Sequence, residues 1–174
     1  MKLHFIFFSF LKKLLYRSLY ENVHFSKDVY LAGGVKITVT DGGSLCIEEN
    51  GIIDRYVNIR VNGGEVKIGS NLYVVECSYI ASSKKVSIGR DALIASHVVI
   101  RDNQHIIADL DKPICTQGNE SFGVVIGTNV WIGTKASVLP GGSNTLIGAH
   151  SLVNKNLESN SIYAGIPCKL IRKR

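Results

Sequence analysis

Histidine is the side chain in this sequence best suited to acid–base chemistry, because its unperturbed pKa lies near neutrality. The chain has five histidines. One of them, His105, lies in a stretch of 25 residues, 101–125, with Asp102 three positions earlier. A turn could aim the Asp102 carboxylate at one imidazole nitrogen and leave the other free to take a proton from a hydroxyl or amine. His105 is therefore the candidate general base and Asp102 its candidate orienting group. The alternative interpretations are a solvated loop histidine and a plain turn residue.

A six-residue repeat must position these groups. Neither a helical period nor strand alternation produces a spacing of six over some 85 residues. Three such units form one triangular coil of a parallel β-helix, in which the repeated aliphatic residue points inward. Gly or Ala often follows it, where a larger side chain would crowd the corner or require a positive φ. The aliphatic positions are Ile68, Val74, Ile80, Ile88, Ile94, Ile100, Ile126, Ile132, Val138, Ile147 and Val153.

The repeat divides the chain into predicted segments. Residues 1–29 form an N-terminal amphipathic helix and lead-in, and residues 30–168 form the β-helix, with irregular early coils over 30–67. Residues 101–125 interrupt the coils as a long loop, which is typical of a functional segment. A second interruption separates Val138 from Ile147 by nine positions, which predicts a cut corner or a bulge. Residues 169–174 form a basic C-terminal tail.

Three motifs give the sequence a family resemblance. The segments NVWIG, LPG and AGIPCKLI follow one another between residues 129 and 171. With these motifs in this order, the chain resembles the hexapeptide-repeat acyltransferases. The resemblance is strongest to the bacterial capsule and O-antigen polysaccharide O-acetyltransferases. The resemblance implies an all-β fold, a left-handed parallel β-helix, with acetyl-CoA as co-substrate and a homotrimer as the active unit. The segment after LPG is about three residues shorter than the commoner family form.

The resemblance also implies a site. His105, 26 residues before Trp131, matches the family's catalytic histidine. Trp131 points outward, since Ile132 holds the inward position, and packs against the thioester end of CoA by resemblance. A backbone amide near Gly133 or Thr134 would stabilise the oxyanion that forms during acyl transfer. The cofactor-binding positions implied are Trp131, Gly133, Thr134, Ala149, Asn154, Lys155, Lys169 and Arg172, with Lys155, Lys169 and Arg172 facing the phosphates.

Charge is concentrated at the two ends of the chain. The formal net charge is +6, but the first 17 and the last six residues hold eight of the 20 basic residues and no acid. The segment between them carries 12 basic and 14 acidic residues. This distribution provides no basic face for nucleic acid.

The four cysteines have no zinc-type spacing and resemble no disulfide framework, so we expect a cytoplasmic protein without a metal.

The basic N-terminus has two interpretations. The apolar run from Leu3 to Leu11 is too short to cross a bilayer. The segment is either an amphipathic helix that packs on the domain or a helix at the inner face of the cytoplasmic membrane. In the second case Lys12, Lys13 and Arg17 would face anionic lipid.

These observations favour an acetyl-CoA-dependent O-acetyltransferase. The expected acceptor is a sugar hydroxyl of a surface polysaccharide, capsule or O-antigen, or of its precursor. The nearest alternative is an N-acetyltransferase of a nucleotide-linked amino sugar. A γ-type carbonic anhydrase would need His97, His105 and His150 to converge on a metal, and it leaves NVWIG and the basic C-terminus unexplained. A third alternative, a scaffold without catalysis, leaves the Asp102, His105 and Trp131 set without a role.

Overall fold

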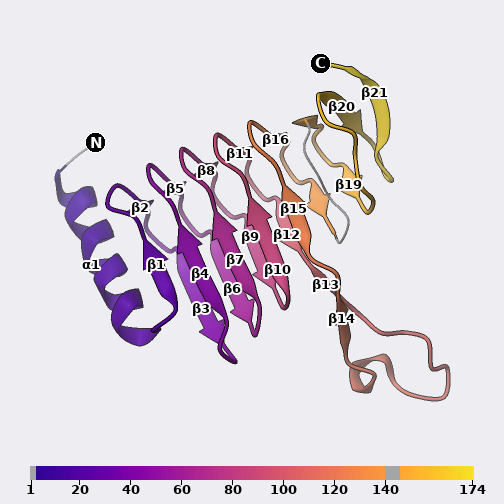
Figure 1. Cartoon of the computed structure of the whole chain (residues 1–174), viewed down its shortest axis with the longest axis horizontal. Helices are drawn as coiled ribbons and strands as arrows, with labels where there is room; N and C mark the ends of the chain where they lie inside the picture. Colours follow the sequence, from indigo (N-terminus) through magenta and orange to yellow (C-terminus); the bar gives the residue numbers. More distant parts are fainter. Residues whose placement is uncertain (1–2, 140–145) are drawn as a thin grey trace.

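Each coil of the chain adds one short strand to each of three parallel sheets. The computed structural model describes residues 3–139 and 146–174. The three sheets form the sides of a triangular prism, with the coils stacked along its axis (Figure 1). A coil passes in turn through sheet A, sheet B and sheet C. The predicted β-helix is confirmed.

The strands of each sheet follow at intervals of one coil. Sheet A contains β1 (Val23–Phe25), β4 (Ser44–Ile47), β7 (Glu65–Ile68), β10 (Lys85–Ile88) and β15 (Val124–Ile126). Sheet B contains β2 (Tyr30–Leu31), β5 (Ile52–Ile53), β8 (Tyr73–Val74), β11 (Leu93–Ile94), β16 (Trp131–Ile132), β18 (Leu146–Ile147), β20 (Ser161–Ala164) and β21 (Lys169–Lys173). Sheet C contains β3 (Lys36–Thr40), β6 (Asn58–Asn62), β9 (Tyr79–Ser82), β12 (Val99–Arg101), β17 (Ser137–Val138) and β19 (Leu152–Val153).

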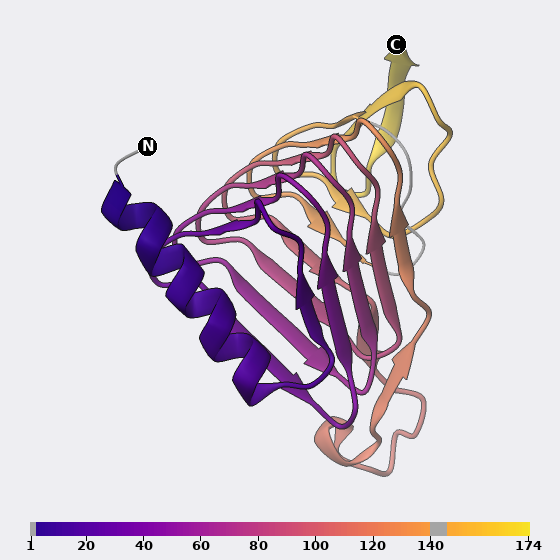
Figure 2. The same cartoon turned by 60° about the vertical axis from the view of Figure 1, so that its left-hand side comes forward.

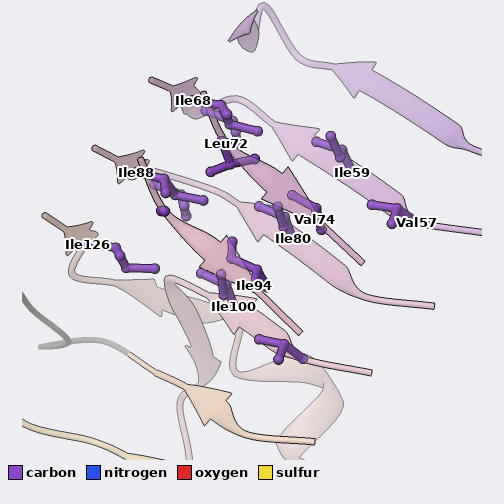
Figure 3. Close-up of a cluster of buried hydrophobic side chains, with 14 of the residues drawn as sticks. Val57, Ile59, Ile68, Leu72, Val74, Ile80, Ile88, Ile94, Ile100 and Ile126 are labelled. Carbon is purple, nitrogen blue, oxygen red and sulfur yellow. The ribbon is translucent and has the colours of Figure 1, made fainter. Parts of the chain in front are cut away.

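Aliphatic side chains fill the prism in columns (Figure 3). In sheet C, for example, Ile59, Ile80 and Ile100 are paired in register and fully buried. Each column continues from coil to coil at the strand spacing of about 4.8 Å. All the repeat positions predicted from the sequence lie in this core.

Glycine is needed at the corners because the coils approach one another closely. A Cβ on Gly89 would lie 2.6 Å from the carbonyl carbon of Gly127 in the next coil. The structure thus supports crowding, rather than a positive φ, as the reason for glycine after the aliphatic residue. Positive φ falls instead on Asn71, Asp91 and Asn129, with values of 56° to 58°. Asn and Asp tolerate this left-handed conformation better than most residues.

Two predicted boundaries differ from the structure. The coils begin at β1, before residue 30, because Val23–Phe25 pairs in parallel with β4. The residues predicted as a basic C-terminal tail, 169–174, include β21, which pairs antiparallel with β20 and extends sheet B. The predicted bulge after Val138 falls largely on residues 140–145, which lie outside the described residues.

Helix α1 (Leu3–Leu19) covers the open N-terminal end of the prism (Figures 1 and 2). Its polar side faces the coils. Lys12 and Arg17 donate hydrogen bonds to the Ala32 and Phe25 carbonyls. Lys13 donates to the Lys27 carbonyl at 2.9 Å. Partial burial lowers the pKa of the Lys12 and Lys13 ammonium groups. The three cations therefore bind the first coil, and the prediction that they face lipid is wrong.

Two further polar groups of α1 complete this cap. The buried Ser9 hydroxyl accepts from the Leu31 amide at 2.8 Å. The Tyr16 hydroxyl donates to the Val35 carbonyl and accepts from the Ile37 amide, both at 3.1 Å. These bonds satisfy backbone groups that an open end of the sheets would otherwise leave exposed for pairing with other chains.

The opposite side of α1 is apolar and exposed. At 3.6 residues per turn, the outward residues from Phe10 to Leu19 span an arc of about 180°. Between Phe10 and Leu19, the one polar residue in this arc is Ser18, which donates to the Leu15 carbonyl at 2.8 Å. The exposed members of the arc are Phe7, Phe8, Phe10, Leu11, Leu14, Leu15 and Leu19. Within the described residues, no helix has the length and apolar character needed to cross a membrane.

The predicted loop 101–125 is a β-hairpin that leaves the prism between β12 and β15 (Figure 1). Its strands β13 (Asn103–His105) and β14 (Asn119–Ser121) pair antiparallel, and its tip contains the 3-10 turn η1 (Ile114–Thr116). The hairpin starts at the edge where sheet C meets sheet A. This edge therefore positions His105.

Asp102 anchors the base of the hairpin. Its side chain is fully buried, and its carboxylate accepts hydrogen bonds from the Ser82 hydroxyl and from the amides of Ser83, Lys84 and Lys85. The four donor–acceptor distances lie between 2.6 and 2.9 Å. The carboxylate is thus fully occupied by the preceding coil. The expected bond from Asp102 to His105 is absent from this structure, which corrects that prediction.

Replacing Asp102 should destabilise the fold. In Asp102→Ala the three amides and the Ser82 hydroxyl lose their acceptor, so we expect the free energy of unfolding to fall by about 3 kcal/mol. Asp102→Asn keeps one acceptor oxygen, so its free energy of unfolding should lie between those of the wild type and Asp102→Ala. Urea denaturation followed by circular dichroism measures the effect, with Asp111→Ala at the exposed hairpin tip as the matched control. Unchanged stability of Asp102→Ala would contradict this anchoring role.

Candidate active site

His105 lies on β13, where its exposed side chain borders a pocket on the outer face of sheet C. The pocket also includes Tyr79 of β9 and Asn119, the register partner of His105 on β14. Among the described residues, no hydrogen bond or ion pair occupies the imidazole. It is therefore free to exchange a proton with a molecule in this pocket. The predicted pair of Asp102 and His105 is not assembled.

Trp131 lies on β16 and is 50% exposed, while its neighbour Ile132 is fully buried. The predicted outward orientation is therefore confirmed. Trp131 ends a stripe of exposed apolar side chains along the outer face of sheet B, one from each coil. The other members are Ile52, Tyr73 and Leu93. A stripe of this kind marks a contact surface.

Tyr73, a member of this stripe, is anchored at its hydroxyl. Burial raises the pKa of the Tyr73 phenol, and its hydrogen bond to the Asp54 carboxylate, at 3.0 Å, acts in the same direction. The neutral phenol thus presents an apolar ring to the stripe and a bonded hydroxyl at its border. The ring is suited to packing against another surface.

His105 and Trp131 lie on opposite sides of the prism. The hairpin leaves at the edge between sheets C and A, and in a three-sided prism this edge is opposite sheet B, which carries Trp131. In Figure 1 the hairpin extends below the coils, whereas β16 lies at their upper edge. A single chain therefore does not bring the predicted base and the predicted thioester-binding tryptophan together.

Gly133, Thr134 and Ala149 lie together at the corner between sheets B and C. The Gly133 amide donates to the Ile147 carbonyl at 2.7 Å, so it is unavailable to a ligand. A Cβ at this position would lie 2.5 Å from the Ala149 amide nitrogen. The Thr134 carbonyl accepts from the His150 amide at 2.9 Å, but its own amide has no acceptor among the described residues. Of the two predicted oxyanion donors, only the Thr134 amide is free.

The predicted phosphate-binding residues lie toward the C-terminal end. Lys169 and Arg172 are exposed on β21, which is separated from β16 in sheet B by β18 and β20. Asn154 and Lys155 are exposed after β19, at the next corner. Burial raises the pKa of the Cys168 thiol, and the nearby Lys155 charge acts in the opposite direction. Lys155 therefore lies close to the turn that leads to Lys169.

The remaining histidines of the coils do not join His105. His97 and His150 are exposed at the corner between sheets B and C, with φ values of 59° and 55°. No group of three metal-ligating side chains occurs within residues 3–139 and 146–174.

Sequence reasoning missed two arginines of the pocket beside His105. Arg60 and Arg101 line it from sheet C, and each is separated by one coil from Ala81. The signal was present as a spacing of 20 to 21 residues, the length of one coil. The strict six-residue repeat starts only at Ile68, so it does not extend to Arg60.

Comparisons with known proteins agree with this geometry. No known protein-family profile matches the chain. The chain is 34% identical over 148 residues to the putative lipopolysaccharide biosynthesis O-acetyl transferase WbbJ of Escherichia coli K12, a match that covers 78% of this chain and 74% of WbbJ.

Solved structures share the fold. AntD, an N-acyltransferase from Bacillus cereus in complex with a dTDP-linked amino sugar and coenzyme A, superposes with a TM-score of 0.73 at 19% identity, over 94% of this chain and 89% of AntD. Galactoside acetyltransferase in complex with coenzyme A superposes with a TM-score of 0.62 at 29% identity, over 78% of this chain and 65% of that one. The chain therefore belongs to the hexapeptide-repeat family of left-handed β-helix acetyltransferases, enzymes that take the acetyl group from acetyl-CoA.

Proposed function

We propose that this enzyme O-acetylates a sugar hydroxyl of a surface polysaccharide or its precursor, with His105 as the general base. The name of WbbJ, an O-acetyl transferase of lipopolysaccharide biosynthesis, supports the acceptor class. The free imidazole of His105 at the border of a polar pocket supports the base. N-acetylation of a nucleotide-linked amino sugar is the second candidate, favoured by the ligand of AntD.

In the proposed reaction His105 takes the proton of the acceptor hydroxyl as its oxygen attacks the acetyl carbonyl carbon. The Thr134 amide is the candidate donor to the oxygen that becomes negative. Acetyl-CoA supplies the acetyl group as a thioester, so that its C–S bond breaks when the new ester forms. The imidazolium then returns its proton to the departing sulfur, which leaves as the free thiol.

The site of this reaction lies between two chains of a homotrimer. The observation that carries this proposal is the separation of His105 from Trp131 on opposite sides of one prism. Packing prisms side by side brings the hairpin of one chain to sheet B of its neighbour, and a heterologous contact of this kind closes into a ring. It would also cover the apolar stripe that contains Trp131. Lys155, Lys169 and Arg172 would then bind the phosphates of CoA at the C-terminal end of this contact between chains.

The base assignment is tested by thiol release from acetyl-CoA. We expect release by the wild-type protein with at least one glycan from a panel of sialic-acid, hexose and amino-sugar acceptors. His105→Ala should lower kcat by at least about 100-fold, because a positioned general base contributes that much. His24→Ala, an exposed histidine on β1, is the matched control and should keep wild-type activity. Full activity of His105→Ala would contradict the assignment, and release only with amino sugars would favour N-acetylation.

We also propose that α1 holds the enzyme at a membrane surface through its outward apolar face. The apolar arc covers about half of the helix circumference. It is therefore wider than the apolar stripe that a helix needs for packing against one neighbour. A convex half-cylinder of Phe and Leu without charge is suited to insertion at the lipid interface. In the proposed trimer, prisms side by side would place three such faces in one plane, and the three contacts would reinforce one another. Insertion should therefore depend on apolar burial, not on anionic lipid.

Vesicle flotation tests this contact. Wild-type protein should float with vesicles of phosphatidylcholine alone, and Phe7→Ser/Leu11→Ser/Leu14→Ser should lower the bound fraction by at least about tenfold through lost apolar burial. The matched control is Ile166→Ser/Ile171→Ser, which removes two exposed apolar side chains at the C-terminal end of the chain and should bind like wild type. Binding only to anionic vesicles would contradict the proposal. So would self-association of wild-type protein that the helix variant abolishes.

A further inference from the structure

We infer that the pocket beside His105 binds an anionic group of the acceptor, a carboxylate or a phosphate. That the ligand is the acceptor rests on the proposed function. That the pocket attracts an anion depends only on its own charge and not on the reaction. The pocket has a volume of about 230 Å³. Sites for whole drug-sized ligands usually start at about 300 Å³, so this one holds a single group or ring.

Two arginines and an alanine form the floor of the pocket. Arg60 of β6 pairs in register with Ala81 of β9, and Ala81 pairs in register with Arg101 of β12. Residues in register across parallel strands project from the same face of the sheet. The two arginines therefore stand one coil apart on either side of a methyl group, about 10 Å between their Cα atoms. The small Ala81 side chain leaves the space between them open.

The charge of this pocket is uncompensated. Its lining includes no aspartate or glutamate; the polar members besides the arginines include Asn62, Tyr79 and Asn119. The ion pairs found among the described residues involve neither Arg60 nor Arg101. The nearest carboxylate along the chain, that of Asp102, is buried and occupied by the donors of residues 82–85. Two guanidinium groups without an acidic partner favour an anionic ligand.

Arg101 is held in place for such a ligand. Its Nε donates to the Asn103 carbonyl and its second guanidinium nitrogen donates to Asn103 Oδ1, both at 3.0 Å. Asn103 in turn donates to the Ser83 hydroxyl at 2.8 Å. These bonds fix one side of the Arg101 guanidinium and lower the entropy that binding would otherwise cost. Arg60, by contrast, has no partner among the described residues.

The position of the pocket relates the charge to the reaction. His105 and Asn119 border it from the hairpin, while the arginines lie on sheet C. An acidic group between Arg60 and Arg101 would anchor a sugar ring and leave its hydroxyl groups toward the hairpin. The carboxylate of an acidic sugar and the phosphate of a sugar phosphate share the chemistry that the arginines recognise.

Direct binding tests the inference without any acetyl transfer. We would titrate the full-length protein by calorimetry with glucuronate, N-acetylneuraminate, glucose 1-phosphate and methyl glucoside. We expect Kd for at least one anionic sugar to be lower than for methyl glucoside by about tenfold or more, as for charge-assisted hydrogen bonds. Comparing glucuronate and N-acetylneuraminate with glucose 1-phosphate shows whether the pocket prefers a carboxylate or a phosphate. Equal affinity for methyl glucoside would overturn the inference.

Arg60→Gln should remove this preference. We expect the Kd of the preferred anion to rise about tenfold, with the Kd of methyl glucoside unchanged and with partial rescue in Arg60→Lys. Arg90→Gln, an exposed arginine at another corner, is the matched control and should bind like wild type. No change in Arg60→Gln would overturn the inference. If anionic sugars bind but none is acetylated, the proposed function fails alone; if only neutral sugars bind and react, this inference fails alone.

Discussion

The spacing of hydrogen-bonded strands, about 4.8 Å, is the constraint on which the rest of the structure depends. Successive coils must approach one another this closely along the whole prism. The backbone then leaves no room for a Cβ at Gly89 or Gly133, where it would lie 2.6 or 2.5 Å from the next coil. Inside, the same spacing stacks aliphatic side chains in register (Figure 3). Outside, it stacks the functional side chains in register as well.

Two consequences of this register concern function. On sheet B it aligns Leu93 with Trp131, which builds an apolar stripe. On sheet C it places Arg60 and Arg101 on either side of Ala81, which builds a basic pocket. Neither feature requires a specialised loop. The hairpin, a large insertion, contributes His105 at the edge between sheet C and sheet A, and Asp102 fixes the point at which it leaves.

The sequence predicted the solenoid well because its core obeys a local rule. An aliphatic residue every six positions identifies the inward face directly, and this rule placed Trp131 outside correctly. The role of Asp102 could not be predicted in the same way. Its donors lie 17 to 20 residues earlier, at a distance in sequence that only the coil length makes short in space. Helix α1 packs on the domain, as one of its two interpretations predicts, but an amphipathic pattern does not reveal that its polar side is the one that meets the exposed carbonyls at the end of the prism.

The central claim is that His105 of one chain and Trp131 of another serve the same acetyl group. Mixing His105→Ala and Trp131→Ala chains, each expected to be nearly inactive alone, tests it directly. After joint refolding in equal amounts, random ring assembly should restore about a quarter of the wild-type sites, measured as thiol release from acetyl-CoA. Recovery near this level is the predicted result. No recovery, with mixed trimers shown to be present, would place both residues in a site within one chain and contradict the account.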